Sequence, residues 1–555
     1  MNPNDNKDYT RNSIIFLVLT LMLIFGWNIL FPPPNRTVEN NEIPNSEIIL
    51  TNQTSLTALN KNTASEEPFP ESREITVTTD NYIAKIDEAT GDINYLELLK
   101  HRSNDDPNNN VILLDKNIQY SAQSRLIGAD NHFFLDKIPF TAPTDNYQIG
   151  NKDQIEVVLN KNIDGVSVQK SLIFKKNNYV IDFKYDITNH GDTPLDLTAM
   201  YRLLHNGTPS GEHAFFTNFY TGAVSYTDQD KFQKISFDSI AQNKAEFPKT
   251  ANNGWLGIIQ HYFVSIFFLQ PRDMQSVCQL NDCHLYFNQR KSDKLYEVAF
   301  TTKLPSITNN DTKTLNVSLF LGPKEYKALN ATAENLPLVK DYGMWHIFAN
   351  PLFLTLQYIE SFVHNWGWAI IILVILLKII LYPLTSASTR SMARIRQLTP
   401  KIQAIKENSG DDRVKMQQQM MELYKTEKVN PLGGCLPMLI QFPIFIGLYW
   451  ALFNSVELRG APWIGWITNL SEPDPYYILP ILMAITMFLQ TKFNAPPTDP
   501  MQAKMMKILP LVFSVMFFFF PSGLVLYWLV NNILTILQQW RINKSIESNL
   551  VRNKS

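Results

Sequence analysis

Apolar residues are distributed unevenly along the chain and divide it into three parts. A first apolar run of nineteen residues covers 13–31 and ends at three consecutive prolines. Residues 32–345 are polar, and between 366 and 540 several long apolar runs carry almost no charge. About 20 apolar residues are needed to cross the hydrocarbon core of a bilayer. The pattern therefore predicts a multi-pass α-helical membrane protein with one large domain outside the membrane.

Six membrane spans are expected. The run at 13–31 is interpreted as an uncleaved signal anchor behind a short N-terminus, residues 1–12, because no small-residue cleavage site follows it. The long stretch from 508 to 540 has thirty-three residues, which is too many for one crossing, and the Pro521 region should break it into two helices. The later spans are expected at 366–384, 435–453, 476–493, 508–521 and 522–540.

Basic residues indicate the direction of these spans. Lys and Arg are concentrated in 385–434, recur in 494–507 and in the tail 541–555, and fall to a single Arg459 in the loop 454–475. Basic loops stay in the cytoplasm. Both termini are therefore expected in the cytoplasm and the large domain outside, which fits the inner membrane and periplasm of a bacterium.

The basic segment 385–434 also has apolar residues at helical spacing, which predicts a cytoplasmic helical hairpin. Its basic face is expected to comprise Arg390, Arg394, Arg396, Lys401 and Lys406.

The exported part begins with a polar linker at 32–70, and strand patterns follow over 71–322. Tyr179–Ile187 alternates apolar and polar residues with a period of two, as a half-buried strand does. About 250 residues of such patterns predict a large all-β sandwich. Its Asp and His residues are scattered, so binding, docking or plain spacing is favoured over catalysis. Residues 323–365 predict amphipathic helices, lying either at the membrane–water boundary or packed under the sandwich.

Composition excludes several classes of function. Charged residues make up 18% of the chain and the net charge is −2, which gives no reason to expect sequence-specific binding of nucleic acid. Three cysteines cannot form a disulfide scaffold. Cys278 and Cys283 either form one bridge in an oxidising compartment or remain reduced. No metal-ligand spacing and no phosphate-binding loop occur, so neither a metal nor another cofactor is expected.

One charged residue, Lys378, lies inside a predicted span. Counting from Trp366 at about 1.5 Å per residue places it about 18 Å along the helix. An ionisable group in hydrocarbon is costly and by default marks a functional site. The alternative is that its amine extends to the cytoplasmic interface. Tyr382, four residues on, is expected on the same helical face.

Other polar residues of the spans could line the same cavity, or could join helices by hydrogen bonds. They are Gln441, Asn531, Asn532 and Gln538. No carboxylate is found in the span interiors, which weakens the alternative of a proton-coupled transporter. A lone cation would instead attract acidic residues of another polypeptide.

Four segments closely resemble the YidC/Oxa/Alb family of membrane insertases. They are KVNPLGGCLPMLIQFPIFIGLYW (428–450), DPYYILPILM (474–483), TDPMQ (498–502) and FPSGLVLYWLVNN (520–532). The resemblance implies the Gram-negative type, with a five-helix core around a hydrophilic groove and a periplasmic supersandwich. It places Lys378 where the family carries a groove arginine, and implies client contacts near Phe445, Met487 and Trp528.

The function implied by the resemblance is insertion of inner-membrane proteins, as nascent chains, into the lipid bilayer, without enzymatic chemistry. The implied partners are the Sec translocon (SecYEG and SecDF), with the signal recognition particle receptor and the ribosome as further candidates. The alternative is a polytopic solute transporter with a periplasmic binding domain.

Overall fold

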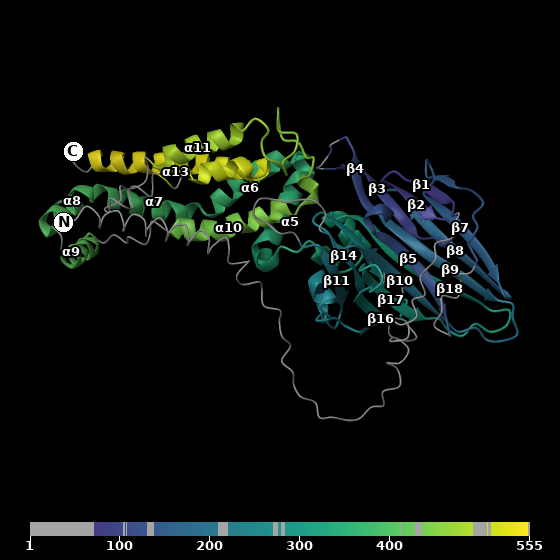
Figure 1. Ribbon diagram of the computed structural model, residues 1–555. Coiled ribbons are helices and arrows are strands. Elements are labelled where there is room, and N and C mark those ends of the chain that lie inside the picture. Colours follow the sequence, from purple (N-terminus) through teal and green to yellow (C-terminus); the bar gives the residue numbers. More distant parts are fainter. Residues whose placement is uncertain are drawn as a thin grey trace, which may run out of the picture. The chain divides into compact units, whose positions relative to one another are not determined.

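The computed structural model describes residues 72–552, apart from 104–105, 107, 130–137, 209–219, 270–275, 279–282, 411, 428–435, 492–507 and 509–511. Two compact units divide the chain, with the boundary between Lys340 and Asp341. The first unit is built from strands and the second from helices (Figure 1). The predicted signal anchor and linker lie outside the described residues.

The β unit contains two large sheets. In the ten-stranded sheet the order is β13-β16-β17-β10-β5-β3-β2-β1-β6, with β4 paired to β3. Its strands are β1 (Glu74–Thr78), β2 (Tyr82–Asp87), β3 (Ile93–Arg102), β4 (Asn110–Asp115), β5 (Ser121–Gly128), β6 (Asn146–Gln148), β10 (Leu197–His205), β13 (Thr250–Ala251), β16 (Cys283–Gln289) and β17 (Tyr296–Lys303). All its described pairings are antiparallel except that of β1 with β6.

The second sheet has eight strands in the order β12-β11-β14-β15-β18-β9-β8-β7. They are β7 (Gln154–Ile163), β8 (Val166–Lys175), β9 (Val180–Asn189), β11 (Gly222–Thr227), β12 (Lys231–Ile235), β14 (Trp255–Ile259), β15 (Phe263–Phe268) and β18 (Thr312–Pro323). Short helices connect or follow the strands: η1 (Lys116–Ile118), α3 (Phe237–Ala241), α4 (Tyr326–Thr332) and η2 (Leu336–Val339).

Aromatic side chains of both sheets meet in the core, which confirms the predicted all-β sandwich. The ring of Phe183 on β9 lies 6.3 Å from that of Tyr201 on β10, and Tyr201 stacks on Phe300 at 5.3 Å. Buried hydroxyls also pair between the sheets: Tyr120 donates to Ser265 at 2.7 Å. This hydrogen bond satisfies both hydroxyls inside the core, so neither carries the cost of an unpaired buried donor.

This core also contains buried charged side chains. Asp92 accepts two hydrogen bonds from Arg125, at 2.5 and 2.8 Å. The Nζ atom of Lys170 donates to the carbonyl of Thr90 at 3.0 Å, and burial lowers the pKa of Lys170 to about 7. Gly91 has a φ of +68°, and a Cβ there would lie 2.7 Å from this Nζ. Glycine therefore provides both the turn and the space for the lysine.

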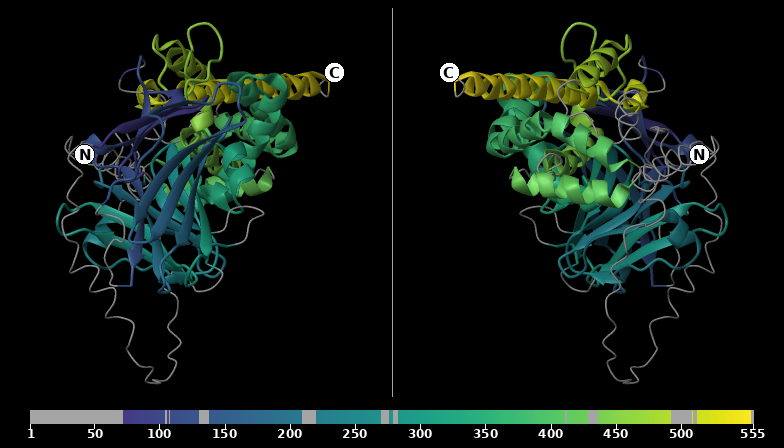
Figure 2. Two further views of the ribbon diagram at one scale, coloured as in Figure 1. Left: turned by 90° about the vertical axis from the view of Figure 1, so that its right-hand side faces the viewer. Right: turned by 90° about the vertical axis from the view of Figure 1, so that its left-hand side faces the viewer.

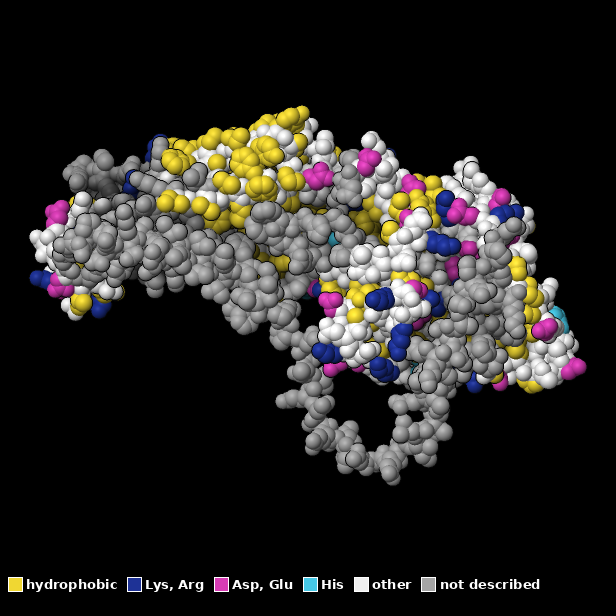
Figure 3. Space-filling view, in the orientation of Figure 1, with side chains coloured by type: hydrophobic (Ala, Val, Ile, Leu, Met, Phe, Trp, Pro, Cys, Tyr) yellow, Lys and Arg dark blue, Asp and Glu magenta, His cyan; other side chains and the backbone are white. Residues whose placement is uncertain are grey.

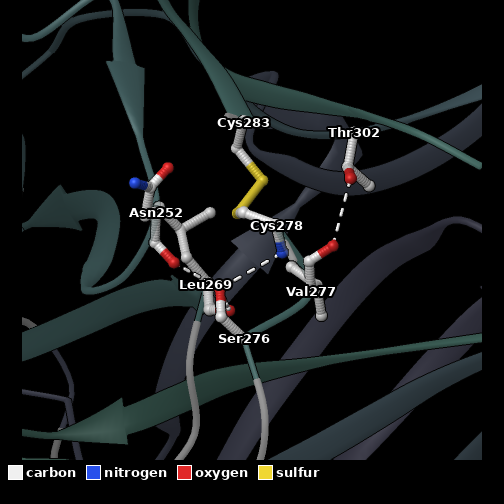
Figure 4. Close-up of a disulfide and its surroundings, with 7 residues drawn as sticks. All are labelled: Asn252, Leu269, Ser276, Val277, Cys278, Cys283 and Thr302. Atoms are coloured by element: carbon white, nitrogen blue, oxygen red, sulfur yellow. Dashed lines mark hydrogen bonds between the residues drawn. A yellow bond between two sulfur atoms is a disulfide. The ribbon is translucent and has the colours of Figure 1, made fainter. Parts of the chain in front are cut away.

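A disulfide joins Cys278 to Cys283, with 5.3 Å between the Cα atoms (Figure 4). Next to it, the amide of Cys278 donates to Ser276 Oγ at 3.1 Å, and Thr302 Oγ1 donates to the carbonyl of Val277 at 3.2 Å. Of the two states that the sequence left open, the structure contains the bridge. Such bonds persist in oxidising compartments.

The helical unit has α5 to α7 first, then a hairpin, and then the apolar helices of the C-terminal part. Its described elements are η3 (Gly343–Trp345), α5 (His346–Val363), α6 (Trp366–Ile380), α7 (Tyr382–Gln397), α8 (Thr399–Ser409), α9 (Arg413–Thr426), α10 (Leu436–Phe453), η5 (Val456–Leu458), α11 (Ile478–Thr491), η6 (Phe517–Phe519) and α13 (Ser522–Arg552). A shared core contains residues from α5, α6, α10, α11 and α13.

The region 323–365 divides between the units. In the β unit, α4 and η2 bury Leu329 and Leu336, and Asn335 donates a hydrogen bond to the Tyr226 hydroxyl at 2.9 Å. In the helical unit, α5 packs against α6 and α10 and buries Phe353 and Leu356. Of the two placements that the sequence left open, α4 and η2 pack against the β sandwich, whereas α5 packs against other helices.

The predicted span 366–384 is interrupted. α6 ends at Ile380, and α7 begins at Tyr382 after a bend of 67°. Pro383 lies in the first turn of α7. A proline there has no N–H to continue the ladder of α6, but is tolerated at a new helix start. The helical stretch therefore changes direction three residues before the predicted boundary.

In its described residues, the segment predicted as a helical hairpin, 385–434, contains three helices, because a break at Leu398 separates α7 from α8 and Pro400 lies in the first turn of α8. α8 and α9 then pair as a short hairpin in which Leu398 and Ile402 are buried. Lys401 forms a salt bridge with Glu427 across this hairpin. The side chain of Asp412 caps the start of α9.

The C-terminal helix is longer than the sequence indicates. Pro521 precedes it, and the amide of Ser522 donates to the carbonyl of Glu472 at 2.7 Å. From Ser522 the helix continues to Arg552, through residues expected to form a separate tail (Figure 2). Lys, Gln, Arg and Glu are good helix formers, so a polar composition alone does not end a helix.

Among the described residues, no single helix is both long and apolar enough to cross a membrane. By length and composition, α6 and α7 pass as a bent pair.

Candidate functional site

A groove of about 750 Å³ lies within the helical unit. Its walls are residues of α6, α7, α10, α11 and α13, most of them polar. The lining comprises Lys378, Thr385, Ser388, Thr389, Met392, Ala393, Arg396, Gln397, Gln441, Phe442, Phe445, Met487, Gln490, Trp528, Asn531, Asn532, Thr535, Gln538, Gln539, Asn543 and Ile546.

Helical periodicity explains why α13 contributes so many of these residues. From Trp528 to Gln539 the lining positions recur at three and four residues, which places them on one face of the helix. The opposite face of α13 exposes Ile533, Leu537 and Trp540. The helix thus has a polar inner stripe and an apolar outer stripe, the reverse of a helix in a water-soluble protein.

Lys378 projects into the groove from the last turn of α6. Its Nζ atom donates a hydrogen bond to the Thr535 hydroxyl at 2.8 Å, and this hydroxyl donates to the carbonyl of Asn531 at 2.6 Å. The side chain is half-buried. No carboxylate lies among the described lining residues. The ammonium charge is therefore held by neutral dipoles and stays available to an external anion.

Hydrogen bonds between helices hold the groove walls. The Gln441 amide donates to the Tyr527 hydroxyl at 2.6 Å, and the Gln538 amide donates to Thr385 Oγ1 at 2.7 Å. Asn532 is buried, and its amide lies 4.0 Å from the sulfur of Met483. These polar residues therefore combine the two roles that the sequence left open: they line a cavity and they connect helices.

The residues that the resemblance implies as client contacts form an apolar wall. The rings of Phe445 and Trp528 meet edge to face at 4.4 Å, and Trp528 lies 5.3 Å from Phe517. Met487 on α11 lines the same groove. Flexible thioethers and aromatic faces can adapt to side chains of varied shape.

Tyr382 lies outside the described lining and is 49% exposed. It was expected on the face of Lys378 because the two are four residues apart. That spacing holds only in an unbroken helix, and the bend at Leu381 separates them.

Of the five predicted hairpin cations, Arg390, Arg394, Lys401 and Lys406 are exposed on α7 and α8 and do not line the groove. Arg396 is also exposed, but it does line the groove. The sequence analysis did not predict that Arg396 lines the groove. It also did not predict that the α7 residues Thr385, Ser388 and Thr389 do so. Their spacing of three and four could have indicated a common face.

Hydrophobic side chains gather on the face of the helical unit formed by α11 and α13 (Figure 3). On α11 the exposed residues Ile481, Ile485 and Phe488 form one face, and α6 exposes Ile379 and Ile380. So large an apolar surface is unusual on a soluble monomer and fits contact with lipid.

No group of His, Cys, Asp or Glu in the described part of the chain could hold a metal ion.

Two family models match consecutive parts of the chain. One is described as YidC periplasmic domain and matches residues 74–355, and the other as 60Kd inner membrane protein and matches residues 358–549. Together they indicate an inner-membrane protein with a periplasmic domain.

Named relatives match almost the entire length. The membrane protein insertase YidC of Neisseria meningitidis serogroup C (strain 053442) is 47% identical, over 96% of this chain and 97% of its own. That of Laribacter hongkongensis (strain HLHK9) is 46% identical, over 98% of this chain and 100% of its own. The chain belongs to the YidC family of membrane protein insertases.

Solved structures give a weaker match. A crystal structure of an active YidC insertase with its first transmembrane domain resolved is 19% identical, with a TM-score of 0.39, covering 84% of this chain and 92% of its own. The comparisons give no support to a solute transporter.

Proposed function

We propose that the groove of this insertase receives the polar flank of a nascent inner-membrane protein while the client's apolar segment moves into lipid. The observation that carries the proposal is the half-buried Lys378, which faces a polar groove with no described carboxylate in its lining. The groove offers hydrogen bonds and a positive charge to residues that would otherwise cross hydrocarbon unpaired.

Apolar burial supplies the free energy of release in this account, and covalent chemistry has no part in it. Transfer of apolar surface out of water is worth about 25 cal/mol per Å². Helix α6, in the predicted span 366–384, has fifteen residues, which is about 22 Å of helix against a hydrocarbon core of about 30 Å. A short span favours local thinning of the bilayer, which lowers the barrier for a polar segment.

The proposed orientation has both termini and the α7–α9 segment in the cytoplasm, with the β unit in the periplasm. Basic residues on α7 and α8 support this orientation by the positive-inside rule, and the disulfide suits an oxidising compartment. We propose the Sec translocon as a partner on the insertion pathway, and the ribosome and the signal recognition particle receptor on the cytoplasmic side.

Photo-cross-linking can test whether the groove holds the client. A cross-linking amino acid is placed at Phe445 or Trp528 in the groove, or at Ile485 on the lipid-facing side of α11 as the control. A ribosome-stalled client should cross-link strongly at the two groove positions and weakly at Ile485. Equal cross-linking at all three positions would contradict the proposal.

A further inference from the structure

The groove extends along α7 well beyond Lys378. Lining residues on α7 recur at three and four residues from Thr385 to Arg396. Thr385 lies near the level of Lys378, because Lys378 bonds Thr535 while Gln538, one turn further along α13, bonds Thr385. Arg396 is eleven residues further along α7 than Thr385, which is about 16 Å of helix.

Arg396 thus adds a second positive charge to the groove. It is exposed, and it has no ion pair with the residues that the structure describes. Arg394, two residues away on the same helix, is equally exposed but does not line the groove. The placement of Arg396 is therefore specific to its face of α7, and a general basic surface does not account for it.

We propose that Arg396 is a second anion-binding position of the groove, which engages acidic residues of a client's translocated segment before they reach Lys378. This inference rests on the proposed function. A guanidinium can bind a carboxylate through two parallel hydrogen bonds. On an exposed residue such a contact is screened and adds little affinity, but it speeds capture and sets selectivity.

Arg396 and Lys378 then act at different stages of insertion. Arg396 meets the client where water is plentiful, so its contribution should fall as salt rises. Lys378 acts deeper, beside Thr535, where screening is weaker. For clients without acidic residues in the translocated segment, the insertion rate should be the same for wild type and Arg396→Gln.

The test uses the full chain in liposomes and two versions of one small client. One client carries two Asp residues in its translocated segment and the other carries Asn at the same positions. Initial insertion rates are measured by protease protection for wild type, Arg396→Gln, Arg396→Lys and the control Arg394→Gln. Arg396→Gln should slow the Asp client about two- to fivefold and leave the Asn client unchanged, while Arg394→Gln changes neither rate. Arg396→Lys should retain most of the wild-type rate.

A variant with the opposite charge at position 396 separates an electrostatic role from a purely structural one, because only an electrostatic role makes the effect depend on the charge of the client. Arg396→Asp should slow the Asp client further and recover speed with a client carrying Lys at the same positions. If Arg396→Gln slows both clients equally, or slows neither, the inference is wrong. If wild type inserts neither client above the level of empty liposomes, the proposed function fails as well. If wild type inserts the Asp client and only the Arg396 effect is missing, this inference alone is overturned.

Discussion

The disulfide between Cys278 and Cys283 should stabilise the β unit measurably. The bonded residues are five apart in sequence, so the bridge closes a loop of about six residues. Loop-closure entropy for that length corresponds to about 2 kcal/mol at 25 °C. We expect the double variant Cys278→Ser, Cys283→Ser to lose about that free energy of unfolding.

The assay is denaturant unfolding of residues 72–340, which contain the complete described sandwich and lack Cys435. Oxidised wild type, reduced wild type and the double variant are compared. Reduced wild type and the double variant should have the same free energy of unfolding, and the reductant should not change that of the variant. If the variant is as stable as oxidised wild type, the bridge contributes nothing and the entropic reasoning is wrong.

In intact cells, the same pair should resist alkylation until reduced, and ready alkylation would contradict the proposed periplasmic location.

Two further predictions concern the same unit. Burial lowers the pKa of His205 from 6.5 to about 4, so the unfolded state binds more protons between these values. Stability should therefore fall by up to about 3 kcal/mol as the pH drops from 6.5 to 4, and His205→Asn should remove that part of the pH dependence in denaturant unfolding. Gly91→Ala should cost at least about 1 kcal/mol more than Gly150→Ala, because both glycines have positive φ but only at Gly91 would a Cβ collide with Lys170 and Leu159. Equal thermal shifts for the two variants would contradict that reasoning.

Much of the fold follows from patterns that act over short distances. The two-residue alternation of Tyr179–Ile187 corresponds to β9, because a strand with one face on the core must alternate. The break near Pro521 is also local, since a proline cannot continue a helix ladder. Lys378 could be singled out because a charge within an apolar run is rare.

The remaining features depend on tertiary contacts. Pro383 marks a bend, but whether α6 bends there or ends there depends on the packing around Leu381. The placement of Arg396 in the groove depends on the direction that α7 takes after that bend. The cysteine bridge depends on how the chain brings Cys278 to the start of β16. Sequence spacing does not contain that information.

The central claim is that the positive charge of Lys378 serves insertion. The most direct measurement is complementation of an insertase-depleted bacterium with wild type, Lys378→Arg, Lys378→Leu and Lys378→Glu. Insertion of a client with an acidic translocated segment is scored by protease protection. The account predicts that wild type and Lys378→Arg support insertion, while Lys378→Leu and Lys378→Glu fail. If wild type and Lys378→Leu insert the client equally well, the charge has no role and the account is contradicted.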